Sequence, residues 1–219
     1  MILISLIVCA LISYLMGSLN SAIIVVKLLK NEDIREHGSK NAGLTNTLRC
    51  YGKFPALLTL IGDLAKGVVA VLVSQAIMNA VSGGTYDLRF VGYFCGLFAV
   101  LGHIFPLYYG FKGGKGVLVC SSVLLVIDPP AFAIVIVFFA IVTAATKYVS
   151  VGSISAALFY VAMTFAMNYF MRHTALSAVL SYTICTALEA AVLIYMHRSN
   201  IQRLRNGTEN KLGEKKKDS

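Results

Sequence analysis

Long apolar stretches follow one another along most of this chain, and a helix needs about 20 such residues to cross the roughly 30 Å hydrocarbon core of a bilayer. Two shorter apolar stretches, 117–127 and 131–145, are separated by Asp128-Pro129-Pro130, a sequence that breaks a helix. We predict an all-α integral membrane protein, a seven-helix transmembrane bundle with two short central helices; a re-entrant hairpin is the alternative for the central pair. The five longer predicted spans are residues 2–29, 54–78, 88–109, 148–170 and 174–196.

Charge and cysteine usage agree with a membrane domain that lacks a metal. Charged residues make up 13% of the chain, about half of what a soluble domain carries. The five cysteines include no Cys-x-x-Cys pair, so we expect neither a disulfide framework nor a zinc site. We interpret residues 1–206 as a single membrane-embedded domain and residues 207–219 as a charged, disordered cytoplasmic tail.

Basic residues predict the orientation in the membrane. Because cytoplasmic loops carry an excess of Lys and Arg, we place the N-terminus outside and the C-terminus in the cytoplasm. The net charge of +9 then reflects topology and attraction to anionic membrane lipid, and we predict no nucleic-acid partner. The outer side receives Arg89 and Arg172, whereas the inner side receives Lys27, Lys30, Arg35, Lys40, Arg49, Lys53, Lys112, Lys115, Lys147 and the basic residues after Met196.

A glycine-rich turn, Phe111-Lys112-Gly113-Gly114-Lys115-Gly116, precedes the first short apolar stretch. A helix that begins after such a turn presents unpaired backbone N–H groups and a partial positive charge, to which Lys115 adds a full charge. The turn therefore predicts an anion site. It is one residue short of a P-loop and lacks the Ser or Thr that binds magnesium, so we do not expect a nucleotide.

A second polar segment, from Asp33 to Arg49, follows the first apolar stretch. Its short hydroxyl, amide and glycine residues can surround oxygen atoms, and Arg49 can bind an anion with two parallel hydrogen bonds. An ordinary solvated turn is the alternative. We favour a second anion site because this segment and the glycine-lysine turn fall on the same predicted side of the membrane.

Two ionisable residues, Asp63 and Lys66, lie inside the second long apolar stretch, and a third, His103, lies near the end of the next one. Asp63 and Lys66 are spaced i, i+3, the separation at which helix side chains meet. A mutual ion pair and a direct role with substrate are equally consistent with this spacing. His103 precedes Pro106 on the side of the glycine-lysine turn, and both a structural and a catalytic role remain open for it.

Taken together, these motifs resemble the bacterial acyl-phosphate:glycerol-3-phosphate acyltransferase family. The resemblance spans nearly the whole chain in order, and three positions depart from the family pattern: Lys40, where we expect glycine, Leu44 and Val119. The residues that carry it are Gly17-Ser18, Asp33-Ile34-Arg35, Gly38-Ser39, Asn41, Gly43, Thr45-Asn46, Arg49, Gly62-Asp63, Lys66-Gly67, Gly102-His103, Phe105-Pro106, Gly113–Gly116, His197-Arg198, Asn200-Ile201, Arg203-Leu204 and Gly207-Thr208-Glu209.

The resemblance implies a multi-pass enzyme of the bacterial cytoplasmic (inner) membrane whose active site faces the cytoplasm. It would transfer a fatty acyl group from acyl phosphate to the 1-hydroxyl of glycerol 3-phosphate in phospholipid biosynthesis, forming lysophosphatidate and phosphate without a cofactor. Because phosphate is a competent leaving group in a mixed anhydride, we expect orientation and charge stabilisation and no covalent acyl-enzyme.

For this reaction we predict four catalytic residues: Ser39, Arg49 and Lys115 bind phosphate, and His103 acts as a general base or orients the hydroxyl. Five of the binding residues, Gly113, Gly114, Asn41, Thr45 and Asn46, are expected to offer backbone or amide contacts at the reacting centre. His197 and Asn200 are implied by the resemblance as contacts of glycerol phosphate. The full set of predicted substrate-binding residues is Asn41, Gly43, Thr45, Asn46, Asp63, Lys66, Gly113, Gly114, His197 and Asn200.

Two other classes of protein share some of these features. A membrane transporter of an organic phosphate would also place polar loops around a cavity, but it would need polar residues on both faces. The predicted outer loops are poor in them. A non-catalytic scaffold would leave the phosphate-type motifs without an explanation. The oligomeric state does not follow from the sequence.

Overall fold

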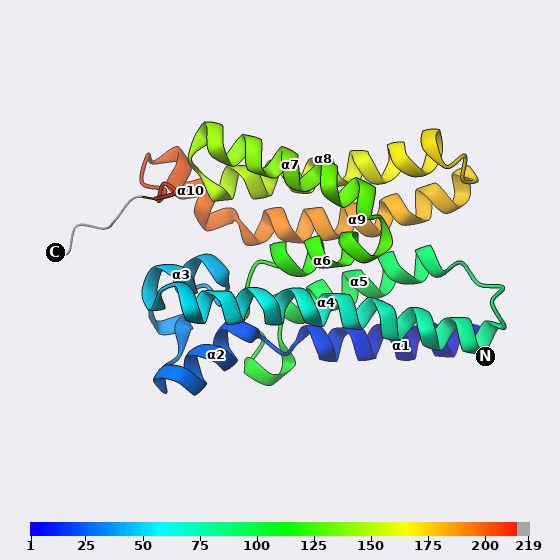
Figure 1. The fold of residues 1–219 in the computed structure, drawn as a ribbon, viewed down its shortest axis with the longest axis horizontal. Helices are drawn as coiled ribbons and strands as arrows, with labels where there is room; N and C mark the ends of the chain where they lie inside the picture. The colour runs from blue at the N-terminus through cyan, green and yellow to red at the C-terminus, as the bar shows by residue number, and fades with distance from the viewer. Residues whose placement is uncertain (214–219) are drawn as a thin grey trace. The chain divides into compact units, whose positions relative to one another are not determined.

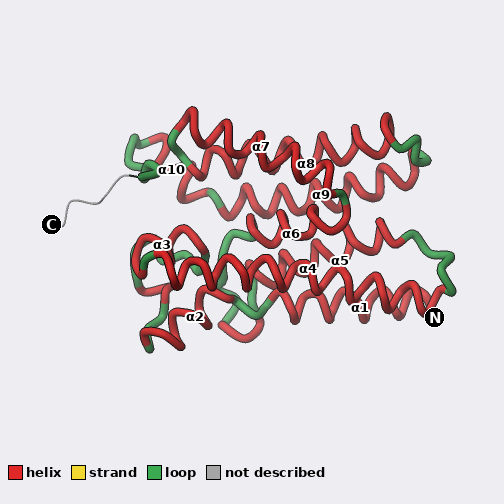
Figure 2. Tube along the Cα trace, viewed as in Figure 1, coloured by secondary structure: helices red, strands yellow, loops and turns green. Residues whose placement is uncertain are grey.

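The computed structural model describes residues 1–213, which form helices and loops without a strand (Figures 1 and 2). The backbone divides into two compact units, Met1–Pro129 and a second that starts at Pro130. Each unit is described by itself.

The first unit is built on three long helices, α1 (Ile2–Gly17), α4 (Lys53–Ser82) and α5 (Leu88–Ile104), which pack against one another. Helix α6 (Val117–Ile127) packs on α4 and α5. The polar end of the unit holds two short helices, α2 (Ser21–Lys30) and α3 (Leu44–Tyr51), and two 3-10 turns, Ile34–Glu36 and Leu107–Tyr109.

Helices α1 and α5 approach closely because each presents a glycine at the contact. A Cβ atom at Gly17 would overlap the backbone oxygen of Ala99, and one at Gly102 would overlap that of Tyr14. Small residues at such positions let helix backbones touch, as is common in membrane proteins. The contact fixes His103, the residue after Gly102, at the level where α1 ends.

The first apolar stretch is not one continuous helix. It breaks after Gly17, and α2 starts again at Ser21 with Asn20 as its N-cap, whose side-chain oxygen accepts a hydrogen bond from the N–H of Ile23 at 3.1 Å. Asparagine is a preferred N-cap residue because its side chain satisfies a free N–H group of the first turn. The break leaves the carbonyl group of Leu19 outside both helices.

The second unit contains α7 (Pro129–Thr146), α8 (Val149–Ala166) followed by a π turn (Met167–Met171), α9 (Leu176–Met196) and α10 (Arg198–Arg205). Helices α8 and α9 pack together, and Phe138 of α7 stacks on Phe159 of α8 with 4.3 Å between ring centroids. Pro129 begins α7 at the position where a missing N–H group is tolerated.

The segment after α10 is fixed to the second unit, although we expected disorder from residue 207. Glu209 accepts hydrogen bonds from Ser150 Oγ at 3.0 Å, Asn200 Nδ2 at 2.7 Å and Arg203 Nε at 2.7 Å. The N–H of Leu212 donates to the oxygen of Lys147. The remainder of the predicted tail, residues 214–219, lies outside the described residues.

Six helices within residues 1–213 are long and apolar enough to cross a membrane, counting α1 and α2 together. Both central stretches are helices, as predicted; α7 reaches 18 residues, whereas α6 has 11. Large apolar side chains of α1, such as Leu3 and Ile4, are exposed on its outer surface. Such exposure is expected where the surrounding solvent is lipid.

Candidate functional site

A buried cluster of charged and polar side chains lies where α1 ends beside α4 and α5. Lys66 Nζ is 2.8 Å from Asp63 Oδ1 and 2.9 Å from His103 Nδ1. It also donates to the backbone oxygen of Leu19 at 2.9 Å. All three side chains are less than a tenth exposed. Of the two predicted roles for Asp63 and Lys66, the mutual ion pair is therefore present.

The two polar loops meet at His103. A Cβ atom at Gly114 would overlap His103 Nε2 and would lie 2.6 Å from the backbone oxygen of Ala42, which belongs to the loop before α3. The same oxygen accepts a hydrogen bond from Asn20 Nδ2 at 3.3 Å. The glycine-lysine turn and the segment 33–49 therefore come together around one imidazole.

We predicted that the backbone N–H groups of Gly113 and Gly114 contact a substrate, but in the structure both donate to carbonyl groups of α5. Gly113 donates to the oxygen of Ile104 at 3.1 Å, and Gly114 donates to the oxygen of His103 at 3.2 Å. These acceptors belong to the last turn of α5, whose carbonyl groups lack partners within the helix. The two glycines therefore close the end of α5. The N–H groups that a helix leaves free for an anion follow them, in the first turn of α6.

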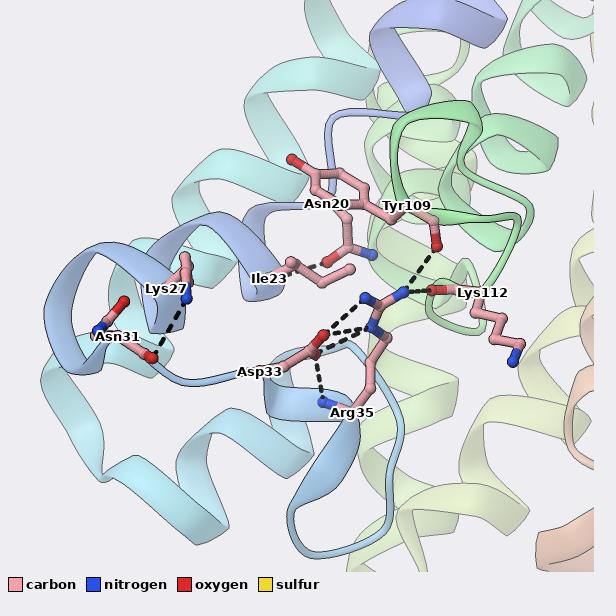
Figure 3. A network of polar contacts seen from close by, with 8 residues as sticks. All are labelled: Asn20, Ile23, Lys27, Asn31, Asp33, Arg35, Tyr109 and Lys112. Atoms are coloured by element: carbon pink, nitrogen blue, oxygen red, sulfur yellow. Dashed lines mark hydrogen bonds and ion pairs between the residues drawn. The ribbon is translucent and has the colours of Figure 1, made fainter.

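Arg35 holds the glycine-lysine turn against the loop that precedes α3 (Figure 3). Its Nη1 atom donates to the backbone oxygen of Tyr109 at 2.7 Å and to that of Lys112 at 3.3 Å. Its Nε and Nη2 atoms donate to the carboxylate of Asp33 at 2.7–3.0 Å. The side-chain hydrogen bond to Arg35 lowers the pKa of Asp33, and the bond from Asp33 raises the pKa of Arg35.

The role of Arg35 was missed in the sequence, although Asp33-Ile34-Arg35 was among the residues that carry the family resemblance. Only the spacing i, i+2 between an acid and a base was available as a signal. The acceptors at Tyr109 and Lys112 are backbone oxygens, which every residue type provides, so the sequence does not single them out.

Asn46 uses its amide group to hold the loop before α3. Its Nδ2 atom donates to the oxygens of Ile34 at 3.3 Å and His37 at 3.0 Å, and its Oδ1 atom accepts from the N–H of Ser39 at 2.9 Å. An amide group that is engaged on both sides has little capacity left for a substrate. We therefore assign Asn46 to loop structure, in contrast to the predicted substrate contact.

The other predicted residues of the segment 33–49, which includes most of α3, differ in exposure. Ser39, Thr45 and Arg49 are exposed, Asn41 is half-buried and Gly43 is buried at the start of α3, where its oxygen accepts from the N–H groups of Asn46 and Thr47. Lys115, in the turn that faces this loop, is half-buried.

Lys40 has a backbone conformation that suits glycine. Its φ angle is +58°, in the left-handed region where an L-residue with a Cβ atom is strained. The sequence departs here from the family pattern, in which we expect glycine. The structure gives the physical reason for that expectation.

His197 and Asn200 lie in the second unit, at the junction of α9 and α10, and both are buried. His197 Nδ1 is 2.8 Å from the backbone oxygen of Leu193, and Asn200 donates to Glu209. The structure therefore explains what orients each of these two side chains within its own unit.

The helices and polar loops define a multi-pass membrane protein whose buried ionisable groups adjoin loops suited to an anionic ligand. A sequence model described as "Glycerol-3-phosphate acyltransferase" matches residues 7–207. The chain belongs to this family.

Relatives and solved structures agree with the family. The chain is 42% identical over 206 residues to a glycerol-3-phosphate acyltransferase of Halalkalibacterium halodurans, with 93% of this chain and 94% of that protein covered. It is 38% identical over 212 residues to the Clostridioides difficile enzyme of the same name, covering 97% and 98%.

Crystal structures of PlsY (YgiH), an integral membrane glycerol 3-phosphate acyltransferase, share the fold. The glycerol 3-phosphate form has a TM-score of 0.80 and 31% identity, covering 95% of this chain and 96% of that one. The lysophosphatidic acid form has a TM-score of 0.77 and 29% identity, with the same coverage. The prediction of an all-α integral membrane protein is confirmed.

Proposed function

We propose that this protein transfers a fatty acyl group from acyl phosphate to the 1-hydroxyl of glycerol 3-phosphate, forming lysophosphatidate and phosphate. Membership of the glycerol-3-phosphate acyltransferase family supports the acceptor and the type of reaction. The two PlsY structures are a glycerol 3-phosphate form and a lysophosphatidic acid form, and these molecules correspond to the proposed substrate and product. The choice of acyl phosphate as donor rests on the motif resemblance and on the chemistry of the loops.

In the proposed step the 1-hydroxyl oxygen of glycerol 3-phosphate attacks the carbonyl carbon of the acyl phosphate. The new ester C–O bond forms as the bond from the carbonyl carbon to the phosphate oxygen breaks, and the phosphate leaves with that electron pair. The hydroxyl proton passes to an oxygen of the leaving phosphate. The step therefore needs orientation and charge stabilisation more than it needs a protein nucleophile.

The observation that carries the proposal is the meeting of two polar loops at His103 and Gly114. Two anionic groups must be held near each other, one from each substrate. The first turn of α6 together with Lys115 would hold one phosphoryl group. Ser39 in the loop before α3 and Arg49 on α3, both exposed, would contact the other. We extend the proposal to His197 and Asn200 as glycerol phosphate contacts, on the strength of the family resemblance.

We also propose that these loops face the cytoplasm of a bacterial cell across its inner membrane. The excess of basic residues in the loops around α2, α3 and the glycine-lysine turn supports this orientation. The acyl chain would remain in hydrocarbon while the phosphoryl groups meet the basic loops at the headgroup level.

An assay with purified components tests the donor and the acceptor. The protein in detergent micelles is incubated with acyl phosphate and glycerol 3-phosphate, without acyl-CoA or acyl carrier protein, and both phosphate and lysophosphatidate are measured. We expect equal amounts of the two products. Lysophosphatidate formed from acyl-CoA but not from acyl phosphate would overturn the assignment of acyl phosphate as donor. No product from either donor would favour a transporter.

A pair of lysine variants tests the phosphate site in the same assay. Lys115→Gln should lower kcat/KM by about tenfold or more, because a charge-assisted hydrogen bond contributes about 1.5–3 kcal/mol. Lys112→Gln is the matched control, since Lys112 is an exposed lysine of the same turn. Equal activity of the two variants would contradict the assignment.

A further inference from the structure

The Lys66 ammonium group has two hydrogen-bond partners and one ion-pair partner. Nζ lies 2.9 Å from the backbone oxygen of Leu19 and 2.9 Å from His103 Nδ1, both at hydrogen-bond geometry, and 2.8 Å from Asp63 Oδ1, with which it forms an ion pair. A lysine ammonium group donates hydrogen bonds and accepts none. Both hydrogen-bond partners must therefore accept. An imidazole can do so at Nδ1 only when that nitrogen carries a lone pair and no hydrogen.

The opposite protonation pattern does not fit the distances. A hydrogen on His103 Nδ1 would need an acceptor, and the carboxylate oxygen Asp63 Oδ1 is 3.6 Å away, beyond hydrogen-bond length. That hydrogen would also point at the Lys66 ammonium group. The neutral imidazole must then carry its hydrogen on Nε2.

The Nε2 atom lies against the glycine-lysine turn. A Cβ atom at Gly114 would overlap it. No residue of the described chain, 1–213, hydrogen-bonds to Nε2, although His103 is only 3% exposed. The imidazole as a whole is buried, but Nε2 is not completely enclosed. An acceptor on a ligand bound where the turn and the loop before α3 meet can therefore reach its N–H group.

We propose that His103 donates a hydrogen bond from Nε2 to a phosphoryl oxygen of a bound substrate, with Lys66 and Asp63 as positioning residues that fix this tautomer. The inference rests on the proposed function, because a phosphoryl group is what acyl phosphate and glycerol 3-phosphate share. His103 is then a hydrogen-bond donor and not a general base. This agrees with a hydroxyl proton that leaves on the phosphate.

Nitrogen NMR of histidine tests the tautomer without turnover. Purified protein with ¹⁵N-labelled histidine side chains is compared with His103→Gln, which identifies the His103 signals among those of the four histidines. An unprotonated nitrogen resonates far downfield of a protonated one, and long-range couplings distinguish the two positions. We expect a protonated Nε2 and an unprotonated Nδ1. The reverse pattern, or a protonated imidazolium, overturns the proposal.

Lys66→Met tests whether the ammonium group selects the tautomer. Methionine keeps an unbranched chain but removes the donor, which leaves the Asp63 carboxylate as the available neighbour of Nδ1. The hydrogen should then move toward Nδ1 in part or completely. An unchanged Nε2–H signal in a folded Lys66→Met protein shows that Lys66 does not fix the tautomer. If this variant does not fold, the spectrum of the unsubstituted protein still decides the main point.

Two substitutions of His103 separate donation from base catalysis. The side-chain NH₂ group of glutamine lies close to the position of Nε2 and donates, whereas it cannot take up a proton near neutral pH. His103→Gln should therefore keep at least about tenfold more kcat/KM than His103→Leu, as expected for a hydrogen bond to a charged oxygen. Equal and severe losses in two folded variants would indicate a base and overturn the proposal.

Titrations identify which substrate supplies the oxygen. Glycerol 3-phosphate and a non-reactive phosphonate analogue of acyl phosphate are added separately to the labelled protein, with inorganic phosphate as a third probe. The probe that occupies the site should shift the Nε2 signal with saturation, and no shift from any of the three overturns the proposal. An active enzyme with the reverse tautomer would refute this inference alone. An inactive enzyme with the expected tautomer would refute the proposed function alone.

Discussion

Arg35 donates a hydrogen bond to the backbone oxygen of Tyr109 over 2.7 Å, which joins two loops 74 positions apart in the sequence. The same guanidinium group is held by Asp33. Because Tyr109 and Lys112 lead directly into the glycine-lysine turn, the ion pair sets the position of the residues that precede Gly113. A side chain that is not itself a predicted phosphate contact thereby affects where those contacts lie.

Replacing Arg35 by lysine should weaken substrate binding. Lysine cannot bind the Asp33 carboxylate with two parallel bonds while also reaching Tyr109 and Lys112. A loss of about 1–2 kcal/mol corresponds to about 5- to 30-fold in kcat/KM. We expect the change mainly in the KM for glycerol 3-phosphate, measured by steady-state assay. Arg205→Lys is the control, since Arg205 is exposed on α10; the same KM change in both variants would contradict the prediction.

The stability that the Asp33–Arg35 ion pair contributes should depend on pH, because the pair requires an ionised Asp33. The hydrogen bond from Arg35 lowers the pKa of Asp33 in the folded protein. The pair therefore contributes stability above the ordinary carboxyl pKa of about 4, and this contribution is lost as the pH falls through the lower folded value. Thermal unfolding in micelles should show this loss, about 0.2–1 kcal/mol for a partly exposed pair. Asp33→Asn should be less stable near pH 6 and should reduce the loss at acid pH; an identical acid profile in both proteins would count against it.

Gly114→Ala should reduce activity strongly. The added Cβ atom would overlap His103 Nε2 and crowd the oxygen of Ala42, and overpacking of this kind costs about 1–3 kcal/mol. We expect a loss of about tenfold or more in kcat/KM and a changed His103 NMR signal. Gly110→Ala is the matched control: its φ angle is +64°, but a Cβ atom there meets nothing within 4 Å. If strain alone mattered, Gly110→Ala would be the more damaging of the two.

Lys40→Gly should stabilise the loop before α3. A left-handed conformation costs an L-residue about 1–2 kcal/mol, part of which is offset because glycine gains entropy in the unfolded chain. We expect a net gain of up to about 1 kcal/mol, measured as a higher midpoint of thermal unfolding. Lys40→Ala removes the charge and keeps the strain, so it should show no such gain. A gain of equal size in both variants would assign the effect to charge.

Glu209→Ala should destabilise the second unit. The carboxylate is almost fully buried and accepts from Ser150, Asn200 and Arg203. Its removal leaves buried donors without an acceptor, at a cost of about 1–3 kcal/mol. Thermal unfolding should show the loss, whereas Thr208→Ala, at an exposed neighbour, should be close to the unsubstituted protein. A Glu209→Ala protein of unchanged stability would contradict the role of this network.

Much of the fold was accessible from the sequence. The five long stretches and the two short central ones all form helices. They could be predicted because the length of an apolar run is visible in consecutive residues and must match the thickness of the hydrocarbon core. The break after Gly17 was not predicted, because the residues from Ser18 to Ser21 continue the first apolar stretch without a proline and the backbone acceptor at Leu19 leaves no mark in the sequence. Helix α3 was also missed, because a helix of eight residues is too short to form without its tertiary contacts.

The candidate site was predicted in part for a related reason. Residue types suited to an anion identified the two loops, and the structure brings them together at His103. The internal bonds of Gly113, Gly114 and Asn46 were not predictable, because each uses a backbone partner that any residue type provides.

The sequence by itself determined that the chain is a helical membrane protein of one family with two basic, glycine-containing loops. The length of each apolar stretch, the distribution of Lys and Arg and the order of the motifs are all properties of consecutive residues. Only the tertiary structure decided that Lys66 meets both Leu19 and His103, which lie 47 and 37 positions away. Those contacts depend on how closely α1 and α5 approach at Gly17 and Gly102. That approach is a property of packed surfaces, which no single segment of the chain contains.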